Sequence, residues 1–172
     1  MSLLGRLLRP QADPREALRP LWHRTVEVSR EAQWYRDGAV ADTVAGRFDM
    51  IAAILALVLL RLEPEAETAG EQVYLTELFV EDMDGQLRES GVGDLVVGKH
   101  IGKLVSALGG RLGAFREALA ANDDAAWHEA LKRNVSLQDG ADPVALGARL
   151  RALFEQLAAI PTDALLRAEW VR

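Results

Sequence analysis

Apolar residues recur along most of this sequence at spacings of three and four, which is the period of an amphipathic α-helix. The repeat is clearest over residues 75–87, 97–119 and 146–157. The alternation typical of a half-buried strand forms no convincing pattern, and no internal repeat has a solenoid period. The sequence therefore predicts an all-α protein, a single-domain helical bundle of about seven or eight helices.

One apolar block stands apart from these amphipathic stretches. Residues 50–60 are all apolar and Arg61 follows them. The block spans roughly half of the ~20 residues that cross a bilayer, so it predicts a buried helix at the centre of the bundle. Asp42 and Thr43, both common N-cap residues, precede this helix, which we expect to end near Leu62.

Prolines, glycines and capping residues set the other expected boundaries. Pro20 can begin a helix that ends before Asp37, with a possible earlier start at Asp13-Pro14. Asp142-Pro143 has the form of an N-cap followed by a proline at the first helical position. We expect Gly109-Gly110 to interrupt the helix that begins near Val97.

Charge is distributed unevenly along the chain. The net charge is −6, which argues against nucleic-acid binding. Residues 1–24 carry five arginines against two acidic residues, whereas residues 63–94 carry ten acidic residues and one arginine. This division predicts a polarised surface and a partner that recognises charge. The absence of cysteine excludes disulfides and thiolate metal sites and fits a reducing compartment.

The first residues form a separate region in this interpretation. Residues 1–13 are expected to be a basic amphipathic segment, in which Leu3, Leu4, Leu7 and Leu8 lie beside Arg6 and Arg9. Residues 14–172 are expected to form the all-α domain. No signal-peptide pattern is present, which predicts a soluble, cytoplasmic protein. The alternative is a peripheral membrane-surface scaffold at the inner membrane that uses the basic segment to contact anionic lipid.

No residue set predicts catalysis or a bound cofactor. Gly93–Lys99 has the glycine and lysine spacing of a phosphate-binding loop, but His100 stands where Ser or Thr would coordinate magnesium. Asp82-Met83-Asp84-Gly85 fails as a calcium loop because Val80 and Gly91 stand at the two ligand positions that flank it. The three histidines, at positions 23, 100 and 128, lack metal-ligand spacing. We therefore expect no cofactor, no metal and no enzymatic activity.

Three stretches of the chain resemble one known family. Residues 40–49 read V-A-D-T-V-A-G-R-F-D, residues 82–94 read D-M-D-G-Q-L-R-E-S-G-V-G-D, and a G-K pair at 98–99 is followed by G-R at 110–111 and A-L at 118–119. These strings, together with Trp34-Tyr35, are similar to the signature of the ubiquinol–cytochrome c chaperone family. The resemblance covers about residues 20–135. Phe115 stands where the family has a tyrosine.

The resemblance implies a role in the assembly of respiratory complex III. Members of the family hold newly made cytochrome b before haem loading, so the implied partner is cytochrome b or another complex III subunit. The composition, rich in Arg, Ala, Gly and Leu, looks bacterial.

The residues of the resemblance also suggest a partner-binding site. We expect Arg47 and Asp49 to form buried ion pairs and Asp84 to pair with Arg88 one helical turn away. The site requires the loop before the central helix to meet the loop after Glu89. The predicted partner-binding residues are Tyr35, Asp42, Thr43, Arg47, Asp84, Arg88, Glu89, Asp94 and Lys99.

Overall fold

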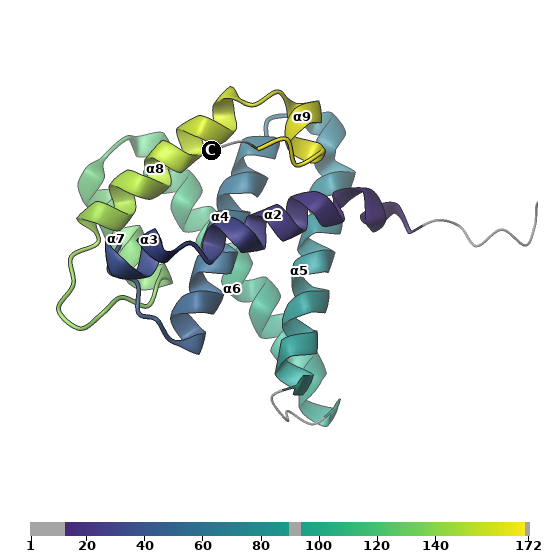
Figure 1. Ribbon diagram of the computed structural model, residues 1–172, viewed down its shortest axis with the longest axis horizontal. Coiled ribbons are helices and arrows are strands. Elements are labelled where there is room, and N and C mark those ends of the chain that lie inside the picture. The colour runs from purple at the N-terminus through teal and green to yellow at the C-terminus, as the bar shows by residue number, and fades with distance from the viewer. Residues whose placement is uncertain (1–12, 90–93, 171–172) are drawn as a thin grey trace, which may run out of the picture.

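The computed structural model describes residues 13–89 and 94–170, and within them it is a bundle of helices (Figure 1). The elements are the 3-10 helix η1 (Pro14–Leu18), α2 (Arg19–Ser29), α3 (Ala32–Arg36), α4 (Val44–Leu62), the 3-10 helix η2 (Ala66–Thr68), α5 (Ala69–Glu89), α6 (Asp94–Ala121), α7 (Asp124–Asn134), α8 (Val144–Ala159) and α9 (Thr162–Leu166). The predicted fold class, an all-α single-domain bundle, is confirmed.

The helix α4 is the centre of the bundle, as the apolar block predicts. Every residue from Met50 to Leu60 is buried. The helix packs against α2, α6 and α8, which surround it on several sides (Figure 1). Its first turn is capped by Thr43, whose hydroxyl accepts a hydrogen bond of 3.1 Å from the backbone N–H of Gly46. The burial of α4 therefore fixes the axis around which the other helices are arranged.

The prediction of one continuous helix that begins at Pro20 and ends before Asp37 is wrong. The structure has two helices there, α2 and α3. The hydroxyl of Ser29, the last residue of α2, donates to the carbonyl oxygen of Val26, and α3 begins three residues later. The indole N–H of Trp34 then donates to the carbonyl oxygen of Val28 at 2.6 Å. This bond turns α3 back onto the end of α2 and buries Trp34 completely.

The expected interruption at Gly109-Gly110 is also wrong, because α6 runs unbroken from Asp94 to Ala121. Each glycine costs the helix about 0.5–1 kcal/mol relative to alanine. The buried residues Leu108 and Phe115 on the same helix stabilise it against that cost, through burial worth about 1.5–3 kcal/mol per side chain. The Gly98-Lys99 pair lies inside this helix as well, so the string does not form a phosphate-binding loop.

Two short extended segments join the beginning of the chain to its later half. Val40 and Leu137 form an isolated antiparallel bridge, flanked by backbone hydrogen bonds from Ala41 to Ser136 and from Gln138 to Ala39. Gly46 lies against this junction so closely that a Cβ there would be 1.9 Å from the carbonyl oxygen of Ala41. The junction therefore fixes the entrance to α4, and it requires glycine at position 46.

The described helices show neither a membrane span nor a metal site. None of those in residues 13–89 and 94–170 combines the length and the apolarity that crossing a bilayer requires. In the same ranges no cluster of three His, Asp or Glu side chains could hold a metal ion.

Candidate partner-binding site

A groove of about 830 Å³ opens between the start of α4, the end of α5 and the middle of α6. We call it the basic groove, and its apolar lining residues are Val44, Ala45, Phe48, Ile51, Met83, Leu104 and Ala107. Val44 is 88% exposed, although it belongs to the same helix as the fully buried core residues. An apolar surface that remains open at the end of a core helix is suited to the apolar face of another segment.

Three cations accompany this apolar lining, and they give the groove its name. Arg30, Arg47 and Lys103 line it together with Gln86, and no carboxylate is among the described lining residues. Their arrangement favours a partner that combines an apolar face with carboxylates or with the negative end of a helix dipole.

The α4 half of the predicted site forms one connected group. The Arg47 guanidinium donates to a carboxylate oxygen of Asp42 at 2.7 Å and lies over the ring of Tyr35, 5.6 Å from its centroid. The Tyr35 hydroxyl donates to the carbonyl oxygen of Ser29, and burial of its ring raises the pKa of this phenol. Thr43, and not Asp42, caps α4, so the Asp42 carboxylate can accept the hydrogen bond from Arg47.

The α5 half of the predicted site faces other surfaces. The Arg88 guanidinium donates to Asp84 at 2.9 Å, which is the expected pair, and Asp84 lines a different hollow beside α6. Glu89 lines a hollow between α5 and α2. Among the described side chains of α5, Met83 and Gln86 alone line the basic groove. The structure therefore brings Tyr35, Asp42, Thr43 and Arg47 together and places the three α5 residues around the groove, not in it.

Two further predicted residues begin α6. The backbones of Asp94 and Lys99 lie in its first two turns, and their side chains lie outside the described part of the chain. The loop at residues 90–93, which the prediction brings close to α4, lies outside it as well.

The sequence reasoning missed the apolar residues of the groove. Phe48 is half-buried at the edge of the core, and a large aromatic residue on a helix gives no sign in the sequence that it lines a groove. Met83 and Leu104 follow the same helical period as the buried residues of α5 and α6, so their spacing carries no separate signal. The sequence did contain one sign of the groove, which is Val44. This apolar residue lies in the first turn of α4, before the continuous buried block of that helix begins.

The second ion pair of the α4 motif is buried and has a partner far away in the sequence. Arg111 donates to Asp49 at 2.8 Å, and the exposed fractions of the two side chains are 5% and 17%. Asp49 also accepts hydrogen bonds from the backbone N–H and the hydroxyl of Ser136, while Arg111 donates to the carbonyl oxygen of Asn134.

This pair corrects part of the expectation for Arg47 and Asp49. Asp49 is in a buried pair, as expected, whereas Arg47 is exposed and pairs with Asp42. Burial lowers the pKa of Arg111, and the adjacent Asp49 carboxylate acts in the opposite direction. The pair joins α4, α6 and the segment after α7, so it holds together the helices that carry the basic groove.

The sequence and the fold can be compared with those of known proteins. The family model described as ubiquinol-cytochrome C chaperone matches residues 36–172. The crystal structure of the Cbp3 homolog from Brucella abortus superposes with a TM-score of 0.80 and 30% sequence identity, covering 99% of this chain and 97% of that one. None of the curated proteins matches the sequence. The match of the family model and the similarity over nearly the whole fold show that this chain belongs to the ubiquinol–cytochrome c chaperone family.

Proposed function

We propose that this protein is a non-enzymatic assembly chaperone of ubiquinol–cytochrome c reductase, respiratory complex III, and that it binds newly made cytochrome b. The observation that carries the proposal is the family match over residues 36–172, a range that includes both α4 ion pairs and most of the basic groove. A chaperone of a membrane protein needs a surface that covers apolar segments, and it needs no catalytic group.

The basic groove has the properties that such a client requires. Phe48 and Ile51 give it an apolar floor, and Val44 adds an exposed apolar edge. Burying side chains of this size contributes about 1.5–3 kcal/mol each. Arg47 and Lys103 can contact carboxylates of the client. The groove therefore supports binding of an apolar helix that carries acidic residues near one end.

Two matched substitutions test whether the client binds in the basic groove. Val44 and Val144 are the first residues of α4 and α8, and they are 88% and 51% exposed. Aspartate is favourable in the first turn of either helix, so neither Val44→Asp nor Val144→Asp should unfold the protein. Only Val44→Asp places a carboxylate at the edge of the basic groove.

The measurement is a pull-down of the tagged protein from cells of its host, with cytochrome b quantified by mass spectrometry. We expect Val44→Asp to reduce the recovered cytochrome b at least about tenfold, which corresponds to 1.4 kcal/mol of binding free energy. Val144→Asp should leave the recovery unchanged. Absence of cytochrome b from the unsubstituted sample contradicts the proposed client, and equal losses in the two variants contradict the proposed groove.

A further inference from the structure

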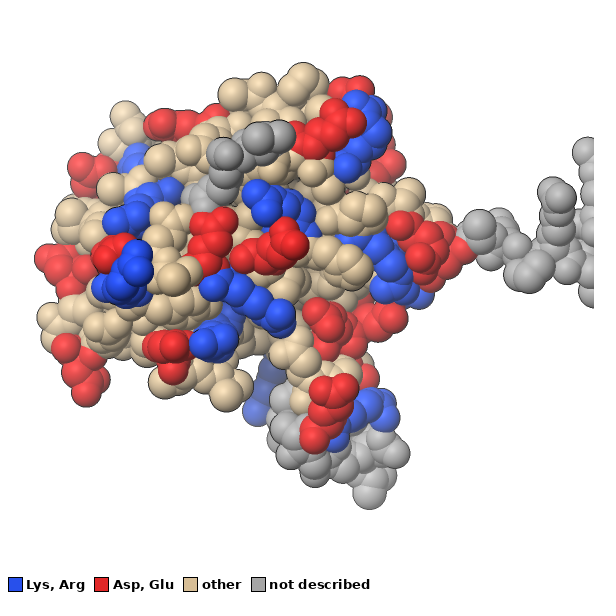
Figure 2. All heavy atoms as spheres, in the orientation of Figure 1, with Lys and Arg blue, Asp and Glu red and all other residues tan. Residues whose placement is uncertain are grey.

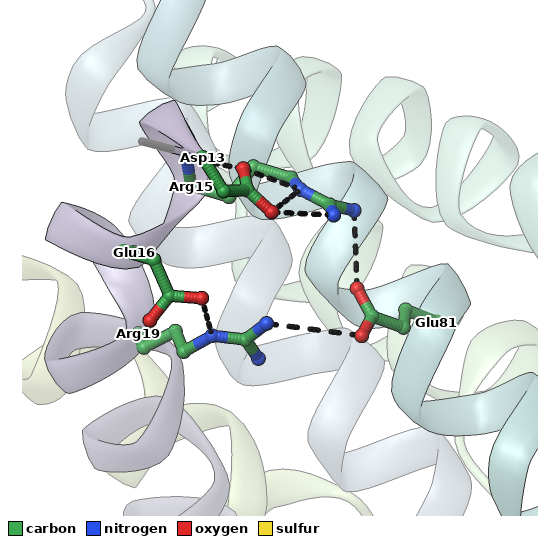
Figure 3. A network of polar contacts seen from close by, with 5 residues as sticks. All are labelled: Asp13, Arg15, Glu16, Arg19 and Glu81. Atoms are coloured by element: carbon green, nitrogen blue, oxygen red, sulfur yellow. Dashed lines mark hydrogen bonds and ion pairs between the residues drawn. The ribbon is translucent and has the colours of Figure 1, made fainter. Parts of the chain in front are cut away.

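Charges near the start of the described chain are neutralised by their neighbours. Arg15 bridges Asp13 and Glu81, and Arg19 lies between Glu16 and the other oxygen of Glu81, at 3.8 Å from that oxygen (Figure 3). The expected division of charge along the sequence thus becomes contact in the fold, while the expected basic segment before residue 13 lies outside the described part of the chain. On the face seen in Figure 2, basic and acidic side chains accordingly lie among one another.

Two cations of the basic groove differ from these arginines, because they lack an acidic partner. Arg30, the C-cap of α2, and Lys103 of α6 both line the groove, and neither makes an ion pair with any described residue. The third cation, Arg47, pairs with Asp42 in a contact that is more than half exposed on both sides. Since no carboxylate is among the described lining residues, the groove has an excess of positive charge.

Two of the three cations lie near one another, beside Tyr35. The Arg47 guanidinium lies over the ring of Tyr35. Burial raises the pKa of the Tyr35 phenol, and the positive charges of Arg47 and Arg30 act against this rise, so both guanidinium groups are close to the same ring. Arginine side chains are well suited to phosphate, because their planar N–H groups donate pairs of hydrogen bonds to its oxygens.

The floor of the groove beside these arginines is apolar. It includes Phe48 and Ile51 of α4 and Leu104 and Ala107 of α6, and its volume of about 830 Å³ lies within the range of about 300–1,000 Å³ that is common for pockets of small ligands. Gln86 is the uncharged polar residue among the described lining residues, so the floor offers few hydrogen bonds to a ligand as polar as a nucleotide. The groove therefore suits a ligand that joins an anionic group to an apolar chain.

We propose that the basic groove binds one molecule of an anionic phospholipid, with its phosphate held by Arg30 and Arg47. One acyl chain lies along Phe48 and Leu104. Arg47 leaves Asp42 to contact the phosphate, which costs little because that ion pair is exposed. A lipid site goes beyond the assembly role. If the proposed client also binds in this groove, the lipid and the client cover the same residues and exclude one another.

Calorimetric titration of the full chain with a soluble lipid tests this site. The ligand is diheptanoyl phosphatidylglycerol below its critical micelle concentration, so that the binding of single molecules is measured. We expect one molecule to bind per chain, and we expect diheptanoyl phosphatidylcholine, which carries no net charge, to bind at least about tenfold more weakly. Inorganic phosphate at the same concentration should not compete, because it has no acyl chain to bury.

Matched substitutions on α6 test the location of the lipid. Ala107 and Ser106 are neighbouring exposed residues of this helix, and only Ala107 lines the basic groove. Glutamate is a good helix former, so both variants should keep the circular dichroism of the unsubstituted protein. We expect Ala107→Glu to weaken phosphatidylglycerol binding at least about tenfold, because it places a carboxylate in the groove, and Ser106→Glu to weaken it less than about twofold.

Removal of one phosphate ligand gives a second readout. Arg30→Gln should weaken the binding of phosphatidylglycerol about fivefold, and Arg36→Gln, which changes an exposed arginine of α3 away from the groove lining, should leave it unchanged. Absence of binding, equal affinities for the two lipids, or equal effects of Ala107→Glu and Ser106→Glu overturn the proposal. Binding that begins only above the critical micelle concentration also overturns it, because a lipid surface and not a single molecule is then recognised.

The titration separates the lipid site from the proposed function, because it contains no client. Its failure leaves the assembly role standing, and absence of cytochrome b from the pull-down leaves the lipid site standing.

Discussion

Two aspartate–arginine pairs lie near the start of α4, and they differ most in their burial. Asp42–Arg47 is more than half exposed on both sides, whereas Arg111 and Asp49 are 5% and 17% exposed. Their distances are nearly the same, 2.7 and 2.8 Å. The two pairs therefore have the same chemistry and nearly the same distance, and they differ in how far they are exposed to solvent.

The difference in burial separates a structural role from a binding role. In water an ion pair contributes about 0–1 kcal/mol, so Arg47 can leave Asp42 for a carboxylate of a partner at small cost. A buried charge that loses its partner is destabilising by about 3–5 kcal/mol, so Arg111 must stay with Asp49. The same stretch of sequence thus contains Arg47, which lines the basic groove, and Asp49, which holds together the helices that form it.

The largest effect should come from removing the buried cation. Arg111→Ala leaves the Asp49 carboxylate without its cation, and we expect the free energy of unfolding to fall by about 3–5 kcal/mol in denaturant titrations. Arg116→Ala, on the same helix but 50% exposed, is the control and should lower it by less than about 1 kcal/mol. Equal losses in the two variants would contradict the difference between buried and exposed pairs.

Double-mutant cycles should give the next largest difference. For Asp49→Ala with Arg111→Ala we expect a coupling energy of about 2–3 kcal/mol, since the two side chains share a buried contact. For Asp42→Ala with Arg47→Ala we expect about 0.2–1 kcal/mol, and only this value should decrease at 1 M salt. A larger coupling for the exposed pair would reverse the assignment of roles.

The binding role of the exposed pair predicts a smaller change in stability and a change in client recovery. Arg47→Ala should lower the free energy of unfolding by less than about 1 kcal/mol. It should also reduce the cytochrome b recovered in the pull-down about fivefold, which is the loss expected for one charged contact. Arg36→Ala, an exposed arginine on α3 away from the groove lining, should leave that recovery unchanged. Unchanged recovery with Arg47→Ala would remove this residue from the site.

The smallest effect concerns a third pair, Asp13–Arg15, which lies at the start of η1 beside Glu81 of α5. Hydrogen bonds from Arg15 lower the pKa of Asp13 from 3.8 to about 2. A lowered pKa means that the pair stabilises the fold above about pH 4 and that this contribution disappears as the pH falls through about 2. An NMR titration of the Asp13 carboxyl group should show the lowered midpoint, and Arg15→Gln should return it toward 3.8. A midpoint near 3.8 in the unsubstituted protein would show that the contact does not persist in solution.

The fold was largely predictable from the sequence, because the buried face of a helix requires apolar residues every three to four positions. The uniform apolar block predicted α4 and its central position, and the three- and four-residue spacing predicted α5, α6 and α8. The points at which helices end or are interrupted were less predictable. Tertiary packing kept α6 continuous through Gly109-Gly110, and a side-chain bond from Trp34 to Val28 set the turn between α2 and α3.

The candidate site was predictable only where its contacts are local. Asp42 and Arg47 are five residues apart on the chain, and Asp84 and Arg88 are four apart, so helix geometry brings each pair together. Asp49 and Arg111 are 62 residues apart, and both stood in the family strings without any sign that they meet. The basic groove is built by three helices, and its shape depends on packing that no single segment encodes.

The contacts of Asp49 with the segment after α7 also impose an order in time on a chain emerging from the ribosome. Ser136 is made 87 residues after Asp49. At a synthesis rate of about 5–20 residues per second, the Asp49 carboxylate waits about 4–17 s for its last hydrogen-bond donors. During that interval the entrance to α4 lacks its bridge to Leu137, so an incomplete chain has the residues of the basic groove without the support that shapes it. Client binding should therefore begin only after synthesis has passed this point.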